Sequence, residues 1–280
     1  MGTPEKEVVA VGFFDGVHRG HQTILAGADR ALTFRQHPLS VLAPARAPRL
    51  LMSLDERLAA IRACGVREVV ALDFTPELAA LAPEEFLDRY LKPSDGEVSW
   101  GVRCGANWNF GKGGVGNADW LRAHGVKVAV VPYADYEGAP VSSSRIRAAL
   151  AAGDVVAADA MLGRPFRVRA VAAETAHKGV GTQLGYPTVN VLLPELMIDL
   201  PRGVYVVEVA GMRGLANYGV APTMGARQWP SPVLEIHFLG SVPTPPFEID
   251  FLRFLRPERK FASISELQTQ IARDCRAIGM

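Results

Sequence analysis

Two histidines, His18 and His21, stand three residues apart in the stretch GFFDGVHRGH (residues 12–21), which follows the apolar run VVAV. A glycine-rich turn between a strand and a helix presents unpaired backbone N–H groups that can hold an anion. At the head of such a helix the two imidazoles share one face, so both can donate hydrogen bonds to phosphate oxygens. Gly16 and Gly20 allow the phosphate to approach the backbone closely. The spacing therefore predicts a nucleotide phosphate site.

An H-x-x-H pair can also be a structural accident or half of a zinc site. Zinc needs further ligands, and the sequence has no Cys or His cluster to supply them. With the glycines, the preceding strand and Asp15 at the turn, phosphate binding is the better interpretation.

The first half of the chain alternates apolar runs with helical stretches, a pattern typical of an α/β fold. Short, continuous and rich in valine, the runs predict parallel strands buried on both faces, at residues 8–12, 31–34, 68–74, 98–105 and 126–133. Helix signals lie between them: a capping box at Ser53, Pro83 in a first turn and Asn117 as an N-cap. Together they predict an open parallel sheet with right-handed crossovers.

From about Pro165 the pattern changes to strand-like runs broken by Gly and Pro, at residues 165–175, 203–210, 215–222, 233–240 and 247–255. Such runs, without helices of useful length between them, predict an antiparallel barrel.

Two helical segments flank the predicted barrel. Residues 142–163 read as two short helices, the second capped by Asp154, and we place the domain boundary near residue 160. Residues 263–278 open with a capping box at Ser263 and carry an apolar face that should lie against the barrel, formed by Leu267, Ile271, Cys275 and Ile278.

The length, composition, net charge and cysteine count of the chain limit the class of protein. A length of 280 residues with about half apolar residues indicates two folded domains. A net charge of +1 gives no indication of a surface that binds nucleic acid. The three cysteines are far apart, which argues against a disulfide framework and favours a cytoplasmic location. The absence of a signal-peptide core and of a run of ~18 apolar residues argues against a membrane partner.

The motif at residues 12–21 resembles the G-x-F-D-G-V-H-x-G-H signature of the bifunctional bacterial riboflavin kinase/FMN adenylyltransferases, or FAD synthetases. Further segments are similar to that family in the same order, over essentially the whole chain: TFRQHP (33–38), GANWNFGKGGVG (105–116), VSSSRIRAAL (141–150), LGRPF (162–166), LGYPTVN (184–190), GVYVVEV (203–209), NYGVAPT (217–223) and LEIHFL (234–239). The resemblance implies a Rossmann-like nucleotidyltransferase domain with an open parallel sheet at residues 1–160. It implies an antiparallel β-barrel riboflavin kinase domain with a terminal helix at residues 161–280.

For the first domain the resemblance implies transfer of AMP from ATP to FMN, giving FAD and pyrophosphate. It assigns His18 and His21 to the ATP phosphates as catalytic residues, with Mg²⁺ neutralising charge. It implies further phosphate-binding residues at Gly12, Phe14, Asp15, Gly16, Gly20, Asn107, Ser142, Ser143, Ser144 and Arg145. From the residues alone, Ser142 can be only an N-cap and Arg145 only an exposed side chain.

For the second domain the resemblance implies transfer of the γ-phosphate of ATP to riboflavin. It places Glu235 as the base, and Thr188 and Asn190 as ligands of Mg²⁺ and of the ATP phosphates. Strand alternation alone gives a rival interpretation, because it puts Glu235 and His237 on the face opposite Leu234 and therefore toward solvent.

The sequence departs from the family at several positions. The helix after His21 is short, Arg35 and Gln36 replace an acid and a proline, and Ala221 stands where the family often has arginine. Two hypotheses therefore remain. One is an enzyme that makes FMN and then FAD from riboflavin and ATP. The other is a riboflavin kinase with impaired adenylyltransferase, or a non-catalytic flavin-nucleotide carrier or regulator. The sequence leaves the oligomeric state open.

Overall fold

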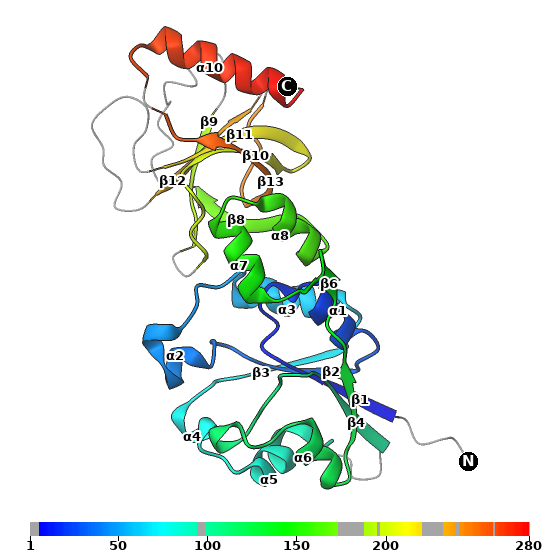
Figure 1. Cartoon of the computed structure of the whole chain (residues 1–280). Helices are drawn as coiled ribbons and strands as arrows, with labels where there is room; N and C mark the ends of the chain where they lie inside the picture. The colour runs from blue at the N-terminus through cyan, green and yellow to red at the C-terminus, as the bar shows by residue number, and fades with distance from the viewer. Residues whose placement is uncertain are drawn as a thin grey trace. The chain divides into compact units, whose positions relative to one another are not determined.

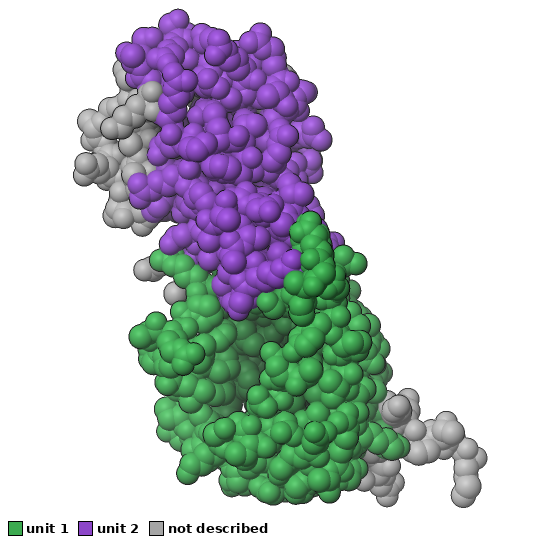
Figure 2. Space-filling model, viewed as in Figure 1, with its two compact units in different colours: residues 1–143 green, residues 144–280 purple. Residues whose placement is uncertain are grey.

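The computed structural model describes residues 6–93, 99–172, 188–194, 197–219, 232–238, 241–259 and 261–279. The chain forms two compact units, residues 1–143 and 144–280 (Figure 2). The two short helices that precede the barrel in sequence belong to the second unit. The domain boundary expected near residue 160 stays a prediction.

The first unit is built on a parallel sheet of five strands in the order β3-β2-β1-β4-β5 (Figure 1). All five expected strands are present: β1 Lys6–Val11, β2 Arg30–Phe34, β3 Glu68–Leu72, β4 Ser99–Gly105 and β5 Lys127–Val131. Because β1 lies between β2 and β4, the order reverses beside β1, and a ligand site is expected at the carboxyl ends of these strands.

Burial on both faces was expected for every strand and is wrong for the edges of the sheet. Val9, Ala10 and Val11 of the central strand are fully buried, whereas Ala129 and Val130 of β5 are exposed. The reason is the strand order, since β3 and β5 each have only one neighbouring strand.

Short helices and a small hairpin connect and cover the strands. In chain order they are η1 Asp15–Val17, α1 Arg19–Leu25, α2 Leu39–Leu42, η2 Pro44–Arg46, α3 Leu54–Ala63, α4 Pro76–Ala79, α5 Pro83–Phe86, η3 Leu87–Leu91, η4 Lys112–Gly114, α6 Ala118–Ala123, β6 Asp135–Tyr136 and β7 Ala139–Pro140. The predicted capping box at Ser53 and the N-cap at Asn117 are both confirmed.

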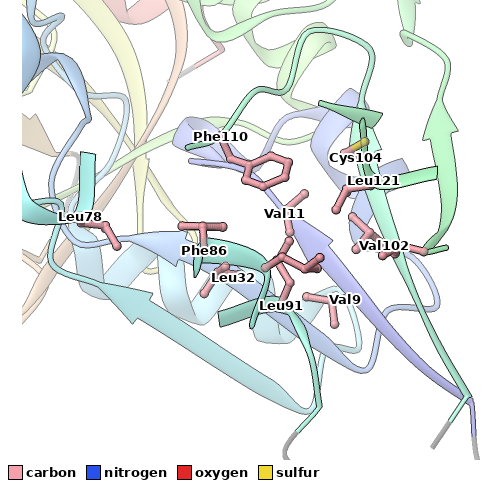
Figure 3. Close-up of a cluster of buried hydrophobic side chains, with 12 residues drawn as sticks. Val9, Val11, Leu32, Leu78, Phe86, Leu91, Val102, Cys104, Phe110 and Leu121 are labelled. Carbon is pink, nitrogen blue, oxygen red and sulfur yellow. The ribbon is translucent and has the colours of Figure 1, made fainter. Parts of the chain in front are cut away.

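Alternating side chains of β1 divide the core between the two faces of the sheet. Val9 and Val11 pack with Phe86, Leu91 and other apolar side chains on one face (Figure 3). Ala10 packs on the other face in a cluster that includes Phe14, Leu25 and Ile61. The turn that follows β1 is therefore tied to the core by Phe14.

The second unit opens with α7 Ser143–Ala151 and α8 Val155–Leu162, the latter capped by Asp154 as expected. A closed antiparallel barrel follows, in the order β10-β11-β12-β9-β8-β13. Its strands are β8 Phe166–Ala172, β9 Thr188–Leu192, β10 Gly203–Val209, β11 Met212–Gly219, β12 Val233–Phe238 and β13 Phe247–Pro257. The sequence interpretation missed β9, which is short and carries Thr188 and Asn190.

The terminal helix α10 (Ile264–Ala277) lies against the barrel, as its apolar face predicted (Figure 1). The four predicted side chains pack on Val204 and Val206 of β10 and Leu215 of β11. The Ser263 side chain caps the helix, and the Glu266 carboxylate accepts from the backbone N–H of Ala262.

Candidate active sites

The turn after β1 is held in an unusual backbone conformation. Phe14, Gly16 and Val17 all have positive φ, at 59°, 79° and 39°. For the two residues with side chains this conformation costs about 1–2 kcal/mol each, so surrounding contacts must fix it. The Phe14 ring is buried, and the Asp15 carboxylate accepts the N–H of Leu51 at 3.0 and 3.2 Å. Asp15 therefore secures the turn from within the protein.

His18 and His21 lie together directly after this turn. His18 is the N-cap of α1, and its Nδ1 accepts the backbone N–H of His21 at 3.3 Å, which leaves Nε2 as the donor. The two rings stack with centroids 3.6 Å apart. A Cβ at Gly20 would stand 3.3 Å from the His18 ring, so this glycine leaves room for the imidazole. The predicted shared face is confirmed.

The surroundings of the pair hold the His21 ring in its neutral form. Burial lowers the pKa of His21 well below its ordinary value, and the neighbouring His18 lowers it further. Within the described structure the buried Nδ1 of His21 has no hydrogen-bond partner. A polyphosphate beside the rings would raise the pKa of His21 again, because negative charge favours the imidazolium form.

Ser143, another predicted residue of the first unit, contacts the same turn. The Ser143 hydroxyl donates to the backbone oxygen of Asp15 at 2.9 Å, which joins segments 128 residues apart. Asn107 is exposed and follows β4, the neighbour of β1, at the carboxyl edge of the sheet. Ser144 and Arg145 occupy the first turn of α7 and belong to the second unit.

Arg35 and Gln36, the two residues after β2 that depart from the family, both contact the segment that follows β3. Gln36 donates to the backbone oxygen of Phe74 at 2.9 Å, and Arg35 pairs with Asp73 at 3.3 Å. Both contacts tie the end of β2 to the segment after β3.

In the second unit, strand register brings the predicted kinase residues together. Asn190 of β9 pairs directly with Glu235 of β12, and Thr188 pairs with His237. Residues paired in this way, and residues two apart on one strand, share a face, so all four side chains lie on one face of the barrel. Each of them is half-buried. The predicted alternation is confirmed, because Leu234 is buried on the opposite face, and Glu235 and His237 are half-buried on theirs.

His237 supports Thr188. Its Nδ1 lies 3.0 Å from the threonine hydroxyl, and burial lowers the pKa of His237 while the Glu235 carboxylate opposes that shift. A neutral imidazole can hold the hydroxyl in one orientation. The sequence interpretation treated His237 as structural.

Two polar residues near these sites were not predicted. Asn217 of β11 pairs with Glu235 on the side away from Asn190, and the motif NYGVAPT contained the only signal for it. Arg57 of α3 is buried beside the turn after β1, and one arginine within a helix gives no signal in the sequence.

Of the kinase-domain positions singled out in the sequence, Thr188, Asn190 and Glu235 are among the residues that the structure describes. Ala221, where the family often has arginine, lies outside the described residues.

A parallel sheet with a histidine pair at its reversal point, followed by a closed barrel bearing carboxylate, amide and hydroxyl groups, defines a two-domain ATP-dependent transferase. The FAD synthetase family model matches residues 1–145 and the riboflavin kinase model matches residues 162–279. The chain belongs to the bifunctional riboflavin kinase/FMN adenylyltransferase family. It phosphorylates riboflavin to FMN with ATP and adenylylates FMN to FAD.

Relatives and a solved structure match along nearly the whole chain. The bifunctional riboflavin kinase/FMN adenylyltransferase of Pseudomonas fluorescens is 36% identical over 96% of this chain and 91% of its own length. That of Bacillus subtilis is 31% identical over 96% and 90%. A crystal structure described as a macrolide-efflux protein from Streptococcus pneumoniae has a TM-score of 0.81 at 27% identity, over 98% of this chain and 93% of that one.

Among the described residues, no helix combines the length and apolar character needed to cross a membrane.

Proposed function

We propose that the two reactions use two separate sites. Adenylyl transfer takes place at residues 12–21, the histidine turn after β1, and phosphorylation takes place at the barrel face shared by β9 and β12. The observation that carries this proposal is that Ser143 contacts the turn that bears His18 and His21, whereas strand register places Asn190 beside Glu235 in the barrel. Gly12, Phe14, Asp15, Gly16 and Gly20 shape the first site, and Asn107, Ser142 and Ser143 contribute phosphate donors. Ser144 and Arg145, which follow Ser143 directly in the chain, are the remaining residues that the resemblance assigns to phosphate binding.

In adenylyl transfer an FMN phosphate oxygen attacks the α-phosphorus of ATP. The new P–O bond forms as the bond to the β-phosphate oxygen breaks, and pyrophosphate leaves. The nucleophile is already an anion, so the demand is for donors that stabilise charge on the leaving group. His18 can give its Nε2–H, and His21 gains a proton more readily as the phosphates approach.

In phosphorylation the ribityl hydroxyl attacks the γ-phosphorus, and ADP leaves. Glu235 accepts the hydroxyl proton, as a carboxylate base can. The hydroxyl of Thr188 and the amide oxygen of Asn190, beside that carboxylate, are hard oxygen donors of the kind that Mg²⁺ prefers. Bound there, Mg²⁺ would neutralise charge on the ATP phosphates.

Paired substitutions test the two-site proposal in the full chain, supplied with riboflavin, ATP and Mg²⁺ and followed by chromatography. His21→Ala should abolish FAD formation and leave FMN formation within about twofold. Glu235→Gln should lower FMN formation by at least ~100-fold, yet leave FAD formation from added FMN unchanged. His124→Ala and Glu208→Gln, outside both sites, serve as matched controls.

If either site variant removed both activities while circular dichroism showed a folded protein, the two-site proposal would be wrong. FMN accumulation without FAD in the unmodified protein would favour the kinase with an impaired adenylyltransferase. Flavin binding without release of ADP or pyrophosphate would favour the carrier. The cytoplasmic location stays a prediction.

A further inference from the structure

Arg57 is the largest fully buried side chain among the described residues. It projects from α3, the helix that begins with the Ser53 capping box, and only 1% of it is exposed. A buried guanidinium is costly unless its charge and its N–H groups are compensated.

The guanidinium joins two segments that flank the adenylyltransferase site. Its Nη2 donates to the backbone oxygens of Phe34 at 2.5 Å and Arg35 at 3.0 Å, where β2 ends. Its Cζ lies 3.9 Å from the centroid of the Phe13 ring, and His37 meets that ring edge-on. Arg57 thus contacts both the histidine turn and the TFRQHP segment.

From Phe13 the contacts continue to the catalytic pair. The neighbouring Phe14 ring lies edge-on to His21 with centroids 5.4 Å apart. Thr33 of β2 donates to the backbone oxygen of Phe13 at 3.0 Å, a second link between the two segments. A shift of Phe13 would therefore move the residue that packs on His21.

The site is poorly optimised for stability alone. Nε and Nη1 of Arg57 are buried and have no hydrogen-bond partner in the described part of the chain. Burial lowers the pKa of Arg57 to about 10, against the attraction of Asp15, so the group remains charged at neutral pH. An apolar side chain of similar volume would avoid this cost. A charged group at this buried position therefore points to a requirement beyond packing.

We infer that Arg57 is a positioning residue for FMN adenylyltransferase. It fixes the spacing between the histidine turn, which faces the ATP phosphates, and the end of β2. Both substrates can still bind when this spacing changes, but attack on the α-phosphorus needs alignment that a displacement of about 1 Å destroys. The effect should therefore fall on kcat.

Arg57→Met, which keeps the volume and removes the donors and the charge, tests this inference. We expect kcat for FAD formation from added FMN to fall about 10- to 100-fold, with KM for ATP and FMN changed less than about threefold. Arg57→Lys keeps the charge without the planar fork and should lose less activity. Arg62→Met, an exposed arginine of the same helix, is the matched control.

Riboflavin kinase activity of the same samples reports on the second unit and should stay unchanged. A purely structural role makes different predictions: activity would follow the folded fraction and return to normal on cooling well below the unfolding transition. That result, an unchanged kcat, or a rise confined to KM would overturn the inference. Failure of both Arg57 variants to fold would also overturn it.

Discussion

His18 combines two roles at the residue scale, helix capping and presentation of an imidazole. The H-x-x-H spacing was enough to predict that the rings share a face. It could not predict that His18 stands at the N-cap position, because that depends on the backbone of the preceding turn, where Val17 has positive φ. The role of Arg57 could not be predicted either, since its partners are backbone oxygens at the end of β2, more than 20 residues away in the sequence.

Asparagine and alanine at position 18 separate these two roles. Asn is a good N-cap and can accept a hydrogen bond from the His21 N–H. The free energy of unfolding of His18→Asn should therefore lie within ~0.5 kcal/mol of that of the unmodified protein. His18→Ala should be about 1 kcal/mol less stable. Both should lose FAD formation, because both lack the Nε2 donor. Denaturant unfolding and the adenylyltransferase assay together check this, and FAD formation by His18→Asn would refute a role for the ring.

At the scale of elements, valine-rich runs were sufficient to find the sheet strands and most barrel strands. The strand β9 has only five residues, and Asn190 at its centre is of a type that is depleted in strands, so the strand was missed. Register was also beyond prediction, because each residue pairs with a partner distant in sequence. Family resemblance supplied Asn190 and Glu235 separately, and only register makes them direct neighbours.

The docking of α10 depends on a buried ion pair in addition to its apolar face. Asp274 is 5% exposed and accepts from Nε and Nη2 of Arg256 on β13, at 3.0 and 2.8 Å, and from Gln270. Asp274→Ala would leave Arg256 uncompensated and should destabilise the second unit by about 2–4 kcal/mol. Glu248→Gln, at the exposed pairs with Arg167 and Arg169, should cost less than ~1 kcal/mol. Equal losses in denaturant unfolding would refute this account of α10.

At the scale of the whole molecule, the two units have separate hydrophobic cores. Each also contains a half-buried titratable group, and the two groups change the stability of their units with pH in opposite directions. In the first unit the pKa of His21 is lowered, so the unfolded chain binds the extra proton and stability falls as pH drops through about 6.5. In the second unit burial and the charge of Asp250 raise the pKa of Asp159 from 3.8 to about 7, although its carboxylate accepts the N–H of Phe166. There the folded state binds the extra proton, and stability falls as pH rises from about 4 through 7.

Calorimetry of the full chain between pH 5.5 and 8 should therefore resolve two transitions that move in opposite directions. The transition of the first unit should rise with pH, and that of the second unit should fall by the equivalent of about 1–2 kcal/mol, allowing for the partial exposure of Asp159. His21→Gln should flatten only the first dependence. Asp159→Asn, which can still accept the N–H of Phe166, should flatten only the second. If each variant changed both transitions equally, the units would unfold as one cooperative body and the separate assignment of the two groups would be wrong.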